Sequence, residues 1–453
     1  MADGGDSPFI DGPRICVDFG TALSKASICL DPDMPLEQGV RALPLGKVSG
    51  AEHPLLTPSV LLVSNGRLFF GPMAFEHAQQ SGETENEALL SFKTVLGAEN
   101  VAQALAAKIG PTLDPTGTFK QRDALVLYLA YLDQLIRAAL IISTPDFPYD
   151  PSYARRRYTS PVWRAGASVD HEFEAVFNEA AAVSQRLGRL FLAPEGISIA
   201  QCKDALDRAA IAPGDGRLES GVFEPHAAAA ASLAFTSTPS NFVFVLDMGA
   251  GTTDFAAFEF NEHSDPPMMD EIKEARQCSL LAGDAIDRAL AAFHLRKSGT
   301  SQSVQEDEHY LRAVRLKARL AKEALFSTGK CTLSHKGKST QIRLQDLAED
   351  EGFRQLQAEI LDVITTSLSP VLQRAHNARA RVVDIVLAGG GARLPFLPQL
   401  IEEASRNRLG STSIRISLLG PPNPDYDTID ASLGDVFPQI AMSIGGAIVE
   451  IAR

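Results

Sequence analysis

The chain has 453 residues, of which 45% are hydrophobic and 22% are charged, a composition typical of soluble globular proteins. This length exceeds what one small core can organise, so it predicts two lobes or domains. The net charge of -14 excludes broad nucleic-acid binding, which needs a positive surface. Five cysteines lie far apart, which argues against a disulfide framework or a zinc site and favours a reducing compartment.

The N-terminal stretch MADGGDSPFIDGPR is acidic and has no apolar centre, so it is unlike a signal peptide. No apolar run in the sequence reaches the length that spans a membrane. Together these two features predict a cytoplasmic protein with no membrane attachment.

The first informative unit is RICVDFGTALSKASICL, Arg14 to Leu30. An apolar strand ends at Asp18, a turn with Gly20 and the hydroxyl of Thr21 follows, and a second apolar stretch completes the unit. Glycine lets the backbone approach an anion closely and present N–H groups to it. Taken alone, the unit fits a tight turn and a phosphate site equally well.

Two features in the next part of the chain have an open role. The basic run 155–157 is short, and we expect a solvated loop there rather than a phosphate patch. The stretch 170–187 predicts a helix, and Ser198 is placed to cap an extra helix that runs through Leu206. The surrounding segment, about residues 188–219, is interpreted either as a partner surface or as a tolerated loop excursion.

The stretch FVFVLDMGAGTTDFAAFEF, Phe242 to Phe260, repeats the pattern of the first unit. Two apolar strands flank a turn of small residues that begins at Asp247 and ends at Asp254. A strand-turn-strand unit argues against the P-loop, which leads from a strand into a helix and ends in Gly-Lys-Ser/Thr. Because aspartates repel phosphate, the two units together predict a phosphate clamp that works with a hydrated magnesium ion.

A third glycine-rich unit is VVDIVLAGGGARLPFLPQLIEEA, Val382 to Ala404. It reads as a strand, a triple glycine at 389–391 and a helix with one apolar face. The glycines allow a flat ligand to lie against the backbone, and Arg393 is placed to stack its guanidinium on an aromatic base.

Three motifs, in this order, resemble the two phosphate motifs and the adenosine motif of the actin-like ATPase superfamily. They are DFGT at 18–21, DMGAGTTD at 247–254 and AGGGARLP at 388–395. Other segments resemble the heat-shock protein 70 (DnaK-type) branch of that superfamily. These are LLSFKTVLG with Lys93, RRRYTSPVW with the switch proline Pro161, VFEPHAAAAASLAF with Glu224, LLAGDAIDRALAAF with Gly283, RLAKEALFST with Lys322, and PQIAMSIGGA at 438–447.

The resemblance implies an α/β, two-lobed actin-like ATPase fold, made of duplicated ribonuclease H-like lobes, with ATP or ADP and Mg²⁺ in a central cleft. Lobe I would take about residues 1–236, lobe II about 237–424, and a closing helix at 425–453 would return to lobe I. The implied metal residues are Asp18 and Asp247, and the implied catalytic residues are Lys93, Glu224, Thr252 and Asp254. The implied nucleotide-binding residues are Gly20, Thr21, Ala22, Gly249, Ala250, Gly251, Gly283, Lys322, Glu323, Gly389, Gly390 and Arg393.

Four positions depart from the family pattern. Ala250 replaces a central glycine and would be strained if its φ were positive. Ala282 replaces the first glycine of a pair, and Gln439 replaces an acidic residue. Glu323 stands where the chaperones have an arginine, which is more similar to actin and implies a one-sided adenine sandwich that rests on Arg393.

Little sequence follows the closing helix, so the peptide-binding domain of the family is not expected. The leading hypothesis is a chaperone-like molecular switch that binds ATP, hydrolyses it slowly and acts through protein partners, as a monomer or in a hetero-complex. The alternatives are an actin-like filament-forming ATPase, a small-molecule kinase, and a slow or non-hydrolysing ATP sensor subunit of a larger complex.

Overall fold

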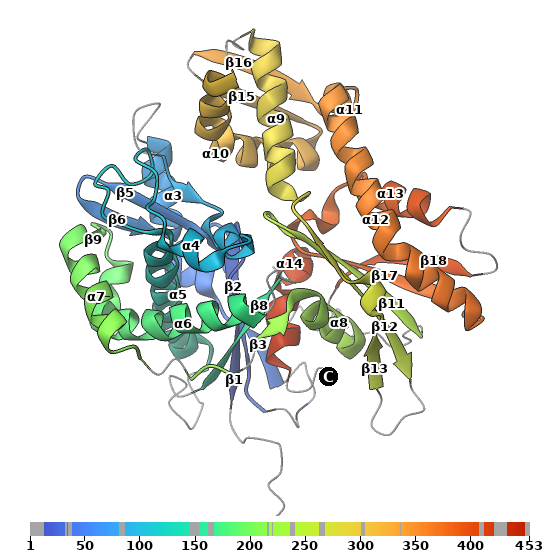
Figure 1. Ribbon diagram of the computed structural model, residues 1–453, viewed down its shortest axis with the longest axis horizontal. Coiled ribbons are helices and arrows are strands. Elements are labelled where there is room, and N and C mark those ends of the chain that lie inside the picture. Colours follow the sequence, from blue (N-terminus) through green and yellow to red (C-terminus); the bar gives the residue numbers. More distant parts are fainter. Residues whose placement is uncertain are drawn as a thin grey trace, which may run out of the picture.

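The computed structural model describes residues 13–31, 34, 39–80, 87–144, 154–161, 167–214, 217–219, 221–235, 241–261, 268–299, 304–335, 337–406, 412–420 and 433–448. These residues form two lobes, each built around a β-sheet with helices packed on it (Figure 1). Helices α8 (Glu224–Phe235) and α14 (Leu433–Ala447) lie between the lobes. The predicted lobe boundaries at 236 and 424 fall outside the described residues and stay predictions.

The described part of lobe I contains a larger sheet in the order β10-β8-β1-β2-β3, with β4 beside β2, and a smaller sheet in the order β7-β5-β6-β9. The strands are β1 (Arg14–Asp18), β2 (Leu23–Cys29), β3 (Val40–Ala42), β4 (Thr57–Pro58), β5 (Val60–Ser64), β6 (Arg67–Phe70), β7 (Leu89–Leu90), β8 (Arg155–Ser160), β9 (Ile197–Ser198) and β10 (Val222–Phe223). The helices are α2 (Leu45–Ser49), α3 (Gly71–Gln80), η1 (Phe92–Gly97), α4 (Val101–Ala106), α5 (Gln121–Ser143), α6 (Ala167–Leu187), η3 (Gly188–Leu192) and α7 (Ile199–Ile211).

The described part of lobe II has a sheet in the order β13-β12-β11-β17-β18, with β14 beside β12, and a separate hairpin of β15 and β16. The strands are β11 (Phe242–Met248), β12 (Thr253–Asn261), β13 (Met268–Glu271), β14 (Gln277–Ser279), β15 (Lys330–His335), β16 (Lys338–Arg343), β17 (Val382–Ala388) and β18 (Ser413–Leu418). The helices are η4 (Lys273–Ala275), α9 (Gly283–Ser298), α10 (Val304–Thr328), α11 (Leu344–Ala348), α12 (Glu351–Asn377), η5 (Gly390–Arg393) and α13 (Leu397–Ser405).

Successive side chains of a strand point to opposite faces of the sheet, so the central strand of each sheet contributes to two cores. In β1, Ile15 and Val17 pack in the core that α5 and α6 cover, whereas Cys16 faces α14. In β11, Phe244 packs in the core of lobe II, whereas Val245 joins the core that contains α8 and α14. The two sheets therefore share one apolar layer, and the helices between the lobes fill it.

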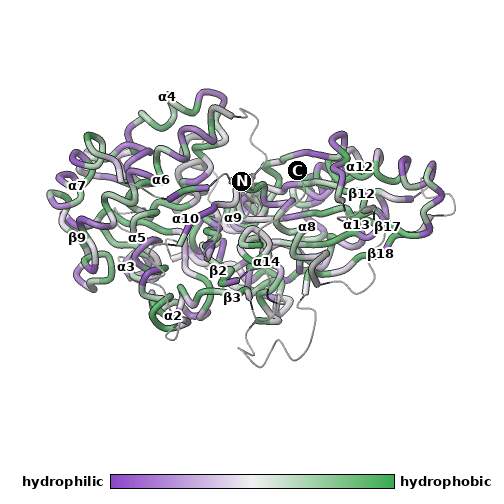
Figure 2. The backbone as a smooth tube through the Cα atoms, turned by 90° about the horizontal axis from the view of Figure 1, so that it is seen from below, coloured by the Kyte–Doolittle hydropathy of each residue, from purple (hydrophilic) through white to green (hydrophobic). Residues whose placement is uncertain are grey.

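Helices α8 and α14 lie side by side near the middle of the molecule (Figure 2), and small residues allow them to pack closely. A side-chain carbon added at Gly445 would collide with the backbone of Ala227, and one added at Gly446 would collide with Cys16. The alanines of α8 at 227–229 are fully buried in this layer. The crossing therefore depends on glycine and alanine at the contact.

Both predicted hairpins are confirmed, because β1 pairs with β2 and β11 pairs with β12 in antiparallel registers. The third unit has the predicted strand β17, but helix α13 begins only at Leu397, so Leu394 precedes the helix. Overall, the described chain has the predicted α/β architecture with two lobes.

The prediction of a solvated loop at 155–157 is wrong, because these arginines form the start of the buried strand β8. Arg156 pairs with Asp133 at 2.5 Å, and Glu219 forms ion pairs with Arg155 at 3.3 Å and Arg157 at 3.5 Å. Partners from distant segments compensate the charges and permit them in the sheet.

The segment predicted as an insertion contains regular elements of lobe I between residues 188 and 211. Ser198 caps α7 in a reciprocal capping box with Gln201, and the helix runs to Ile211 rather than to Leu206. Cys202 and Leu206 of α7 are buried in the lobe I core, and β9 extends the smaller sheet through β6. A loose loop excursion is therefore excluded for residues 197–211.

Contrary to the expectation that no apolar run reaches spanning length, the described helix α5 is long and apolar enough to cross a membrane, judged by length and composition. However, 67% of its apolar window is buried inside the protein, where it packs against α6. Its position in the lobe I core accounts for its apolar composition.

Candidate functional site

A cavity of about 480 Å³ lies between the lobes and has the size of a small-molecule site. The loops after β1, β11 and β17 line it, together with α10, the start of α9 and the first residue of α8. The structure brings every predicted site residue to this cavity except Gly251 and Asp254, which lie behind its surface. The predicted residues that line it are Asp18, Gly20, Thr21, Ala22, Lys93, Glu224, Asp247, Gly249, Ala250, Thr252, Gly283, Lys322, Glu323, Gly389, Gly390 and Arg393.

The lobe I hairpin contributes a buried ion pair to the cavity. Asp18 and Lys25 are directly opposite in the register of β1 and β2, and Lys25 Nζ lies 2.8 Å from Asp18 Oδ2. Burial lowers the pKa of Lys25, but the attraction of Asp18 outweighs that effect and leaves this pKa above its ordinary value. The turn between the strands is held by Ser59, whose hydroxyl donates to the carbonyl of Gly20 at 2.7 Å.

A second buried ion pair joins two of the predicted catalytic residues. Lys93 in η1 donates from Nζ to Oε1 of Glu224, the first residue of α8, at 2.8 Å. A helix N-terminus favours a carboxylate at this position. The ammonium of Lys93 also lies 5.7 Å from the ring centroid of Phe19, which follows Asp18.

The lobe II hairpin places two carboxylates opposite one another. Asp247 and Asp254 are register partners in β11 and β12, and both are buried. Burial raises the pKa of Asp247 well above its usual range. The neighbouring carboxylates of Glu224, Asp254 and Asp18 raise this pKa further. The hairpin therefore holds a carboxyl group whose ionised form needs a positive partner.

The arrangement fits a magnesium ion that is held through water and a ligand. The described residues contain no group of three His, Cys, Asp or Glu side chains that would hold a metal directly. Mg²⁺ usually keeps several waters and binds through one or two carboxylates plus substrate phosphates. Oδ1 of Asp247 is buried without a hydrogen-bond partner, and Asp18 lines the same cavity. Asp18 and Asp247 are therefore suited to a hydrated cation.

The loop at 249–252 is shaped by close contacts with its surroundings. A side-chain carbon at Gly251 would lie 2.8 Å from Oγ1 of Thr21 in lobe I, so only glycine fits there. The backbone N–H groups of Gly283 and Asp284, at the start of α9, donate to the carbonyls of residues 249 and 250 at 3.1 and 2.6 Å. Ala250 is not among the described residues with positive φ, so alanine adds no strain to the loop.

Gly389 is needed beside the carboxylate of Asp247. Its φ is +80°, and a side-chain carbon there would collide with Asp247 Oδ1 and with the backbone of Met248. The left-handed conformation and the close approach both favour glycine. The third glycine-rich loop is thus packed directly onto the lobe II hairpin.

Helix α10 contributes Lys322, Glu323 and Phe326 to the cavity, and η5 contributes Arg393. Lys322 Nζ lies 2.8 Å from Asp287 Oδ1 and donates to the carbonyl of Gly283 at 3.1 Å. Lys322 is thereby fixed against the start of α9, and Phe326, one turn further along α10, adds an aromatic surface that suits a nucleobase.

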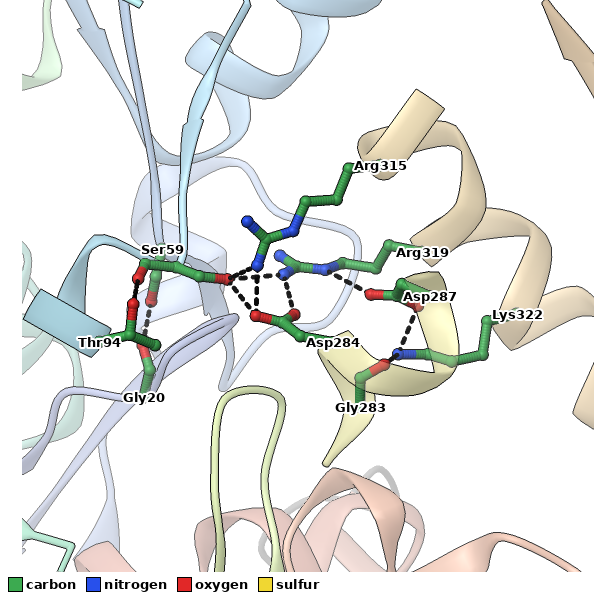
Figure 3. A network of polar contacts seen from close by, with 10 residues as sticks. Gly20, Ser59, Thr94, Gly283, Asp284, Asp287, Arg315, Arg319 and Lys322 are labelled. Carbon is green, nitrogen blue, oxygen red and sulfur yellow. Dashed lines mark hydrogen bonds and ion pairs between the residues drawn. The ribbon is translucent and has the colours of Figure 1, made fainter. Parts of the chain in front are cut away.

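A polar cluster joins the two lobes beside the cavity (Figure 3). The hydroxyl of Ser91, which directly precedes η1 of lobe I, donates to Oδ2 of Asp284 in α9 at 2.7 Å. Arg315 and Arg319 of α10 both form ion pairs with Asp284, the latter at 2.9 Å. Burial alone would raise the pKa of Asp284, but the two guanidinium groups outweigh it and lower this pKa. We call Ser91, Asp284, Arg315 and Arg319 the interlobe cluster.

The residues that line the cavity and that the sequence reasoning missed include Lys25, Arg319 and Phe326. Lys25 had a signal, because it is the one charged residue in a strand of otherwise small or apolar residues. Arg319 and Phe326 lie three residues before and four residues after Lys322, so they share its helix face. The spacing shows that the three residues share a helix face, but the sequence does not show that this face points into the cavity.

Residues 221–415 match the family model described as Hsp70 protein. The "Chaperone protein HscA homolog" of Pseudoalteromonas atlantica is 23% identical over 394 residues, covering 82% of this chain and 60% of that protein. The protein of the same name from Acidovorax sp. is 28% identical over 159 residues, covering 35% of this chain and 24% of that protein. "Chaperone protein dnaK1" of Prochlorococcus marinus is 24% identical over 192 residues, covering 41% of this chain and 28% of that protein.

The chain thus spans at most 60% of the length of these curated relatives. The family match covers all of α8 and lobe II as far as Arg415 in β18, while the first of these relatives has its similarity spread over most of the chain. The family match places residues 221–415 in the Hsp70 family, and the relatives extend the similarity to most of the chain.

Proposed function

We propose that this protein is an ATP-driven, chaperone-like switch that binds ATP with Mg²⁺, hydrolyses it slowly and acts through protein partners. The observation that carries the proposal is the meeting of both phosphate hairpins and the buried Lys93–Glu224 pair in one cavity between two lobes. Proteins named as chaperones among the relatives support the chaperone part of the proposal.

The residues have distinct roles in this proposal. Backbone groups of the turns at 20–22 and 249–251 hold the phosphates, because glycine-rich turns expose N–H groups. Lys93 stabilises the negative charge that develops on the terminal phosphate. Glu224 and Thr252 line the cavity and orient the attacking water, and Asp254, which is buried and does not line the cavity, assists them from behind. The metal ion, when bound near Asp18 and Asp247, supplies charge neutralisation for the phosphates.

Slow hydrolysis follows from the pairing of the catalytic lysine. Lys93 and Glu224 are 2.8 Å apart and their side chains are only 4% and 11% exposed. Lys93 must give up part of this buried contact to serve a phosphate, which costs free energy. The same observation favours the alternative of an ATP sensor with little or no turnover, and the measured rate separates the two.

ATP binding and turnover test the proposal directly. Calorimetry with ATP and magnesium should show binding, and Lys93→Met should keep binding within a few-fold while hydrolysis falls by about 10²-fold or more. Lys47→Met, at an exposed position on α2, is the matched control and should match the wild type. A wild-type protein that binds no ATP in the presence of magnesium would refute the proposed function.

The partner part of the proposal needs a separate test. Lobe closure around ATP and opening with ADP would change the surface that a partner meets. The segment at 188–219 is one candidate surface, since α7 exposes Ile211, which is 84% accessible. Pull-downs from a cytoplasmic extract should recover different proteins in ATP and in ADP. Identical recovery would leave a nucleotide-independent binder and contradict a switch.

The proposed setting is the cytoplasm, where thiols stay reduced. All five cysteines are free, and the described structure buries four of them. An actin-like filament former remains the structural alternative, and ATP-dependent light scattering at high protein concentration would decide for it.

A further inference from the structure

The two phosphate hairpins differ at one equivalent position. In lobe I, Asp18 is paired in register with Lys25, seven residues later. In lobe II, Asp247 is paired in register with Asp254, also seven residues later. Directly opposed residues of an antiparallel pair project from the same face of the sheet. The position that carries a carboxylate in lobe II therefore carries an ammonium in lobe I.

The surroundings of Lys25 direct its ammonium toward the phosphate turn. Lys25 is 8% exposed and lines the cavity, so its charge is buried at the floor of the cleft. A side-chain carbon built on Gly20 would lie 3.3 Å from Lys25 Nζ, which places the ammonium beside the turn at 20–22. Its ion pair with Asp18 uses one of three N–H groups.

A purely structural role explains this lysine poorly. Replacing a buried ion pair by apolar side chains is often neutral or stabilising, so stability alone gives little reason to keep the pair. The neighbours of Lys25 on β2 are small or apolar and would accept a methionine. The pair is better explained by a ligand that needs the ammonium.

The balance of charge in the cavity supports the same conclusion. Four carboxylates, those of Asp18, Glu224, Asp247 and Asp254, lie in or just behind the cleft floor. Two lysines face them, and each lies 2.8 Å from one carboxylate, Lys93 from Glu224 and Lys25 from Asp18. A phosphate that enters such a site needs nearby positive charge, and Lys25 is the second source of it beside the turn.

We propose that Lys25 is a phosphate-binding residue, which donates from Nζ to the phosphates held by the turn at 20–22 and makes nucleotide binding partly independent of magnesium. The inference rests on the proposed function and adds a residue to it. The ligand class is a nucleoside di- or triphosphate, because both carry the phosphates that such a turn holds.

The test measures the affinities of ADP, ATP and adenosine, each with magnesium and with excess EDTA, for four proteins. These are the wild type, Lys25→Met, Lys25→Arg and the surface control Lys47→Met. In EDTA, Lys25→Met should weaken ADP binding by about 10- to 100-fold, as expected for a hydrogen bond to a charged group. The loss should be smaller with magnesium. Adenosine affinity should not change, and Lys25→Arg should restore most of the ADP affinity.

Several results would overturn the inference. One is an affinity of Lys25→Met for ADP in EDTA that stays within about twofold of the wild type. Another is an equal loss of affinity for adenosine, which would indicate a distorted cavity. Thermal melting checks the fold of each variant. If Lys25→Met is unfolded, the double variant Asp18→Asn with Lys25→Met removes both charges of this ion pair. The double variant should show the same loss of affinity for ADP and no loss for adenosine. A wild type that binds neither nucleotide in magnesium refutes both proposals, whereas a wild type that binds only with magnesium refutes the role of Lys25 alone.

Discussion

Removing the hydroxyl of Ser91 isolates the link between the lobes. In the interlobe cluster, Ser91 is the partner from lobe I, whereas Asp284, Arg315 and Arg319 belong to lobe II. Ser91→Ala therefore leaves the ion pairs inside lobe II intact and removes the hydrogen bonds between the lobes, which the hydroxyl donates to Asp284 and accepts from Arg315 and Arg319. Because Ser91 directly precedes η1, the variant also releases the segment that carries Lys93.

The size of the effect follows from the contacts. The hydroxyl donates to an ionised carboxylate at 2.7 Å, and the carboxylate side chain is only 9% exposed. Hydrogen bonds to charged groups contribute roughly 1.5–3 kcal/mol, or about 10- to 150-fold in an equilibrium constant. The side chain of Arg315 is 34% exposed, so water reaches part of the vacated site. We therefore expect the lower end of this range, an effect of about tenfold on the equilibrium constant.

Release of nucleotide is the most direct assay of this equilibrium. A fluorescent ADP analogue, displaced by excess ATP in a stopped-flow instrument, should dissociate about tenfold faster from Ser91→Ala, if opening of the lobes limits release. Ser91 has a φ of +54°, so alanine keeps the left-handed strain while glycine relieves it. Ser91→Gly should show the same faster release with a higher melting temperature than Ser91→Ala. Wild-type release rates in both variants, within about twofold, would refute an interlobe role for the cluster.

Three further predictions concern stability and charge. Burial alone would raise the pKa of Glu271, but contacts with His226 and Arg276 outweigh it and lower this pKa to about 2. The ionised side chain therefore stabilises the folded protein above pH 4.5, the ordinary pKa, and this stabilisation is lost as pH falls toward 2. Glu271→Gln should therefore reduce the free energy of unfolding at pH 7 by about 1–2 kcal/mol, an amount limited by solvent screening, and flatten its acid dependence in urea titrations. Burial raises the pKa of Asp247, so the ligand-free protein should lose stability as pH rises through this raised pKa. Asp247→Asn should abolish this loss in melting curves, and it should weaken the binding of ATP with magnesium. Ser198→Ala should cost about 1 kcal/mol in chemical denaturation through loss of the α7 cap, and an unchanged midpoint would contradict the capping box.

The hairpins could be predicted because their information is local. An apolar run, a turn of small residues and a second apolar run determine the strands of β1–β2 and β11–β12 without reference to the rest of the chain. The arginines at 155–157 could not be placed in the same way. Their partners Asp133 and Glu219 lie more than twenty residues away on either side, and only the folded chain brings them together.

The candidate site was predictable where the residues belong to a turn and unpredictable where a contact crosses the cavity. The turn at 249–252 and the position of Gly389 were found from spacing alone. Lys25 was overlooked because the register with Asp18, which gives the lysine its meaning, is a property of the sheet. The interlobe cluster was missed for the same reason, since Ser91 and Asp284 are 193 positions apart.

Charge and packing act in opposite directions on the closed cleft. Asp18 of lobe I lies across the floor from Asp247 and Asp254 of lobe II, and repulsion between the ionised carboxylates of the two lobes favours their separation. The interlobe cluster and the contact of Gly251 with Thr21 favour closure. Because α8 and α14 cross through close glycine and alanine contacts, they have little room to slide, and we expect the lobes to move as bodies about this crossing. A ligand controls such a balance only through the free energy by which it prefers one state. A phosphate bound between Lys25 and the turn at 249–251 touches both lobes, so it favours closure, and each phosphate lost reduces that preference.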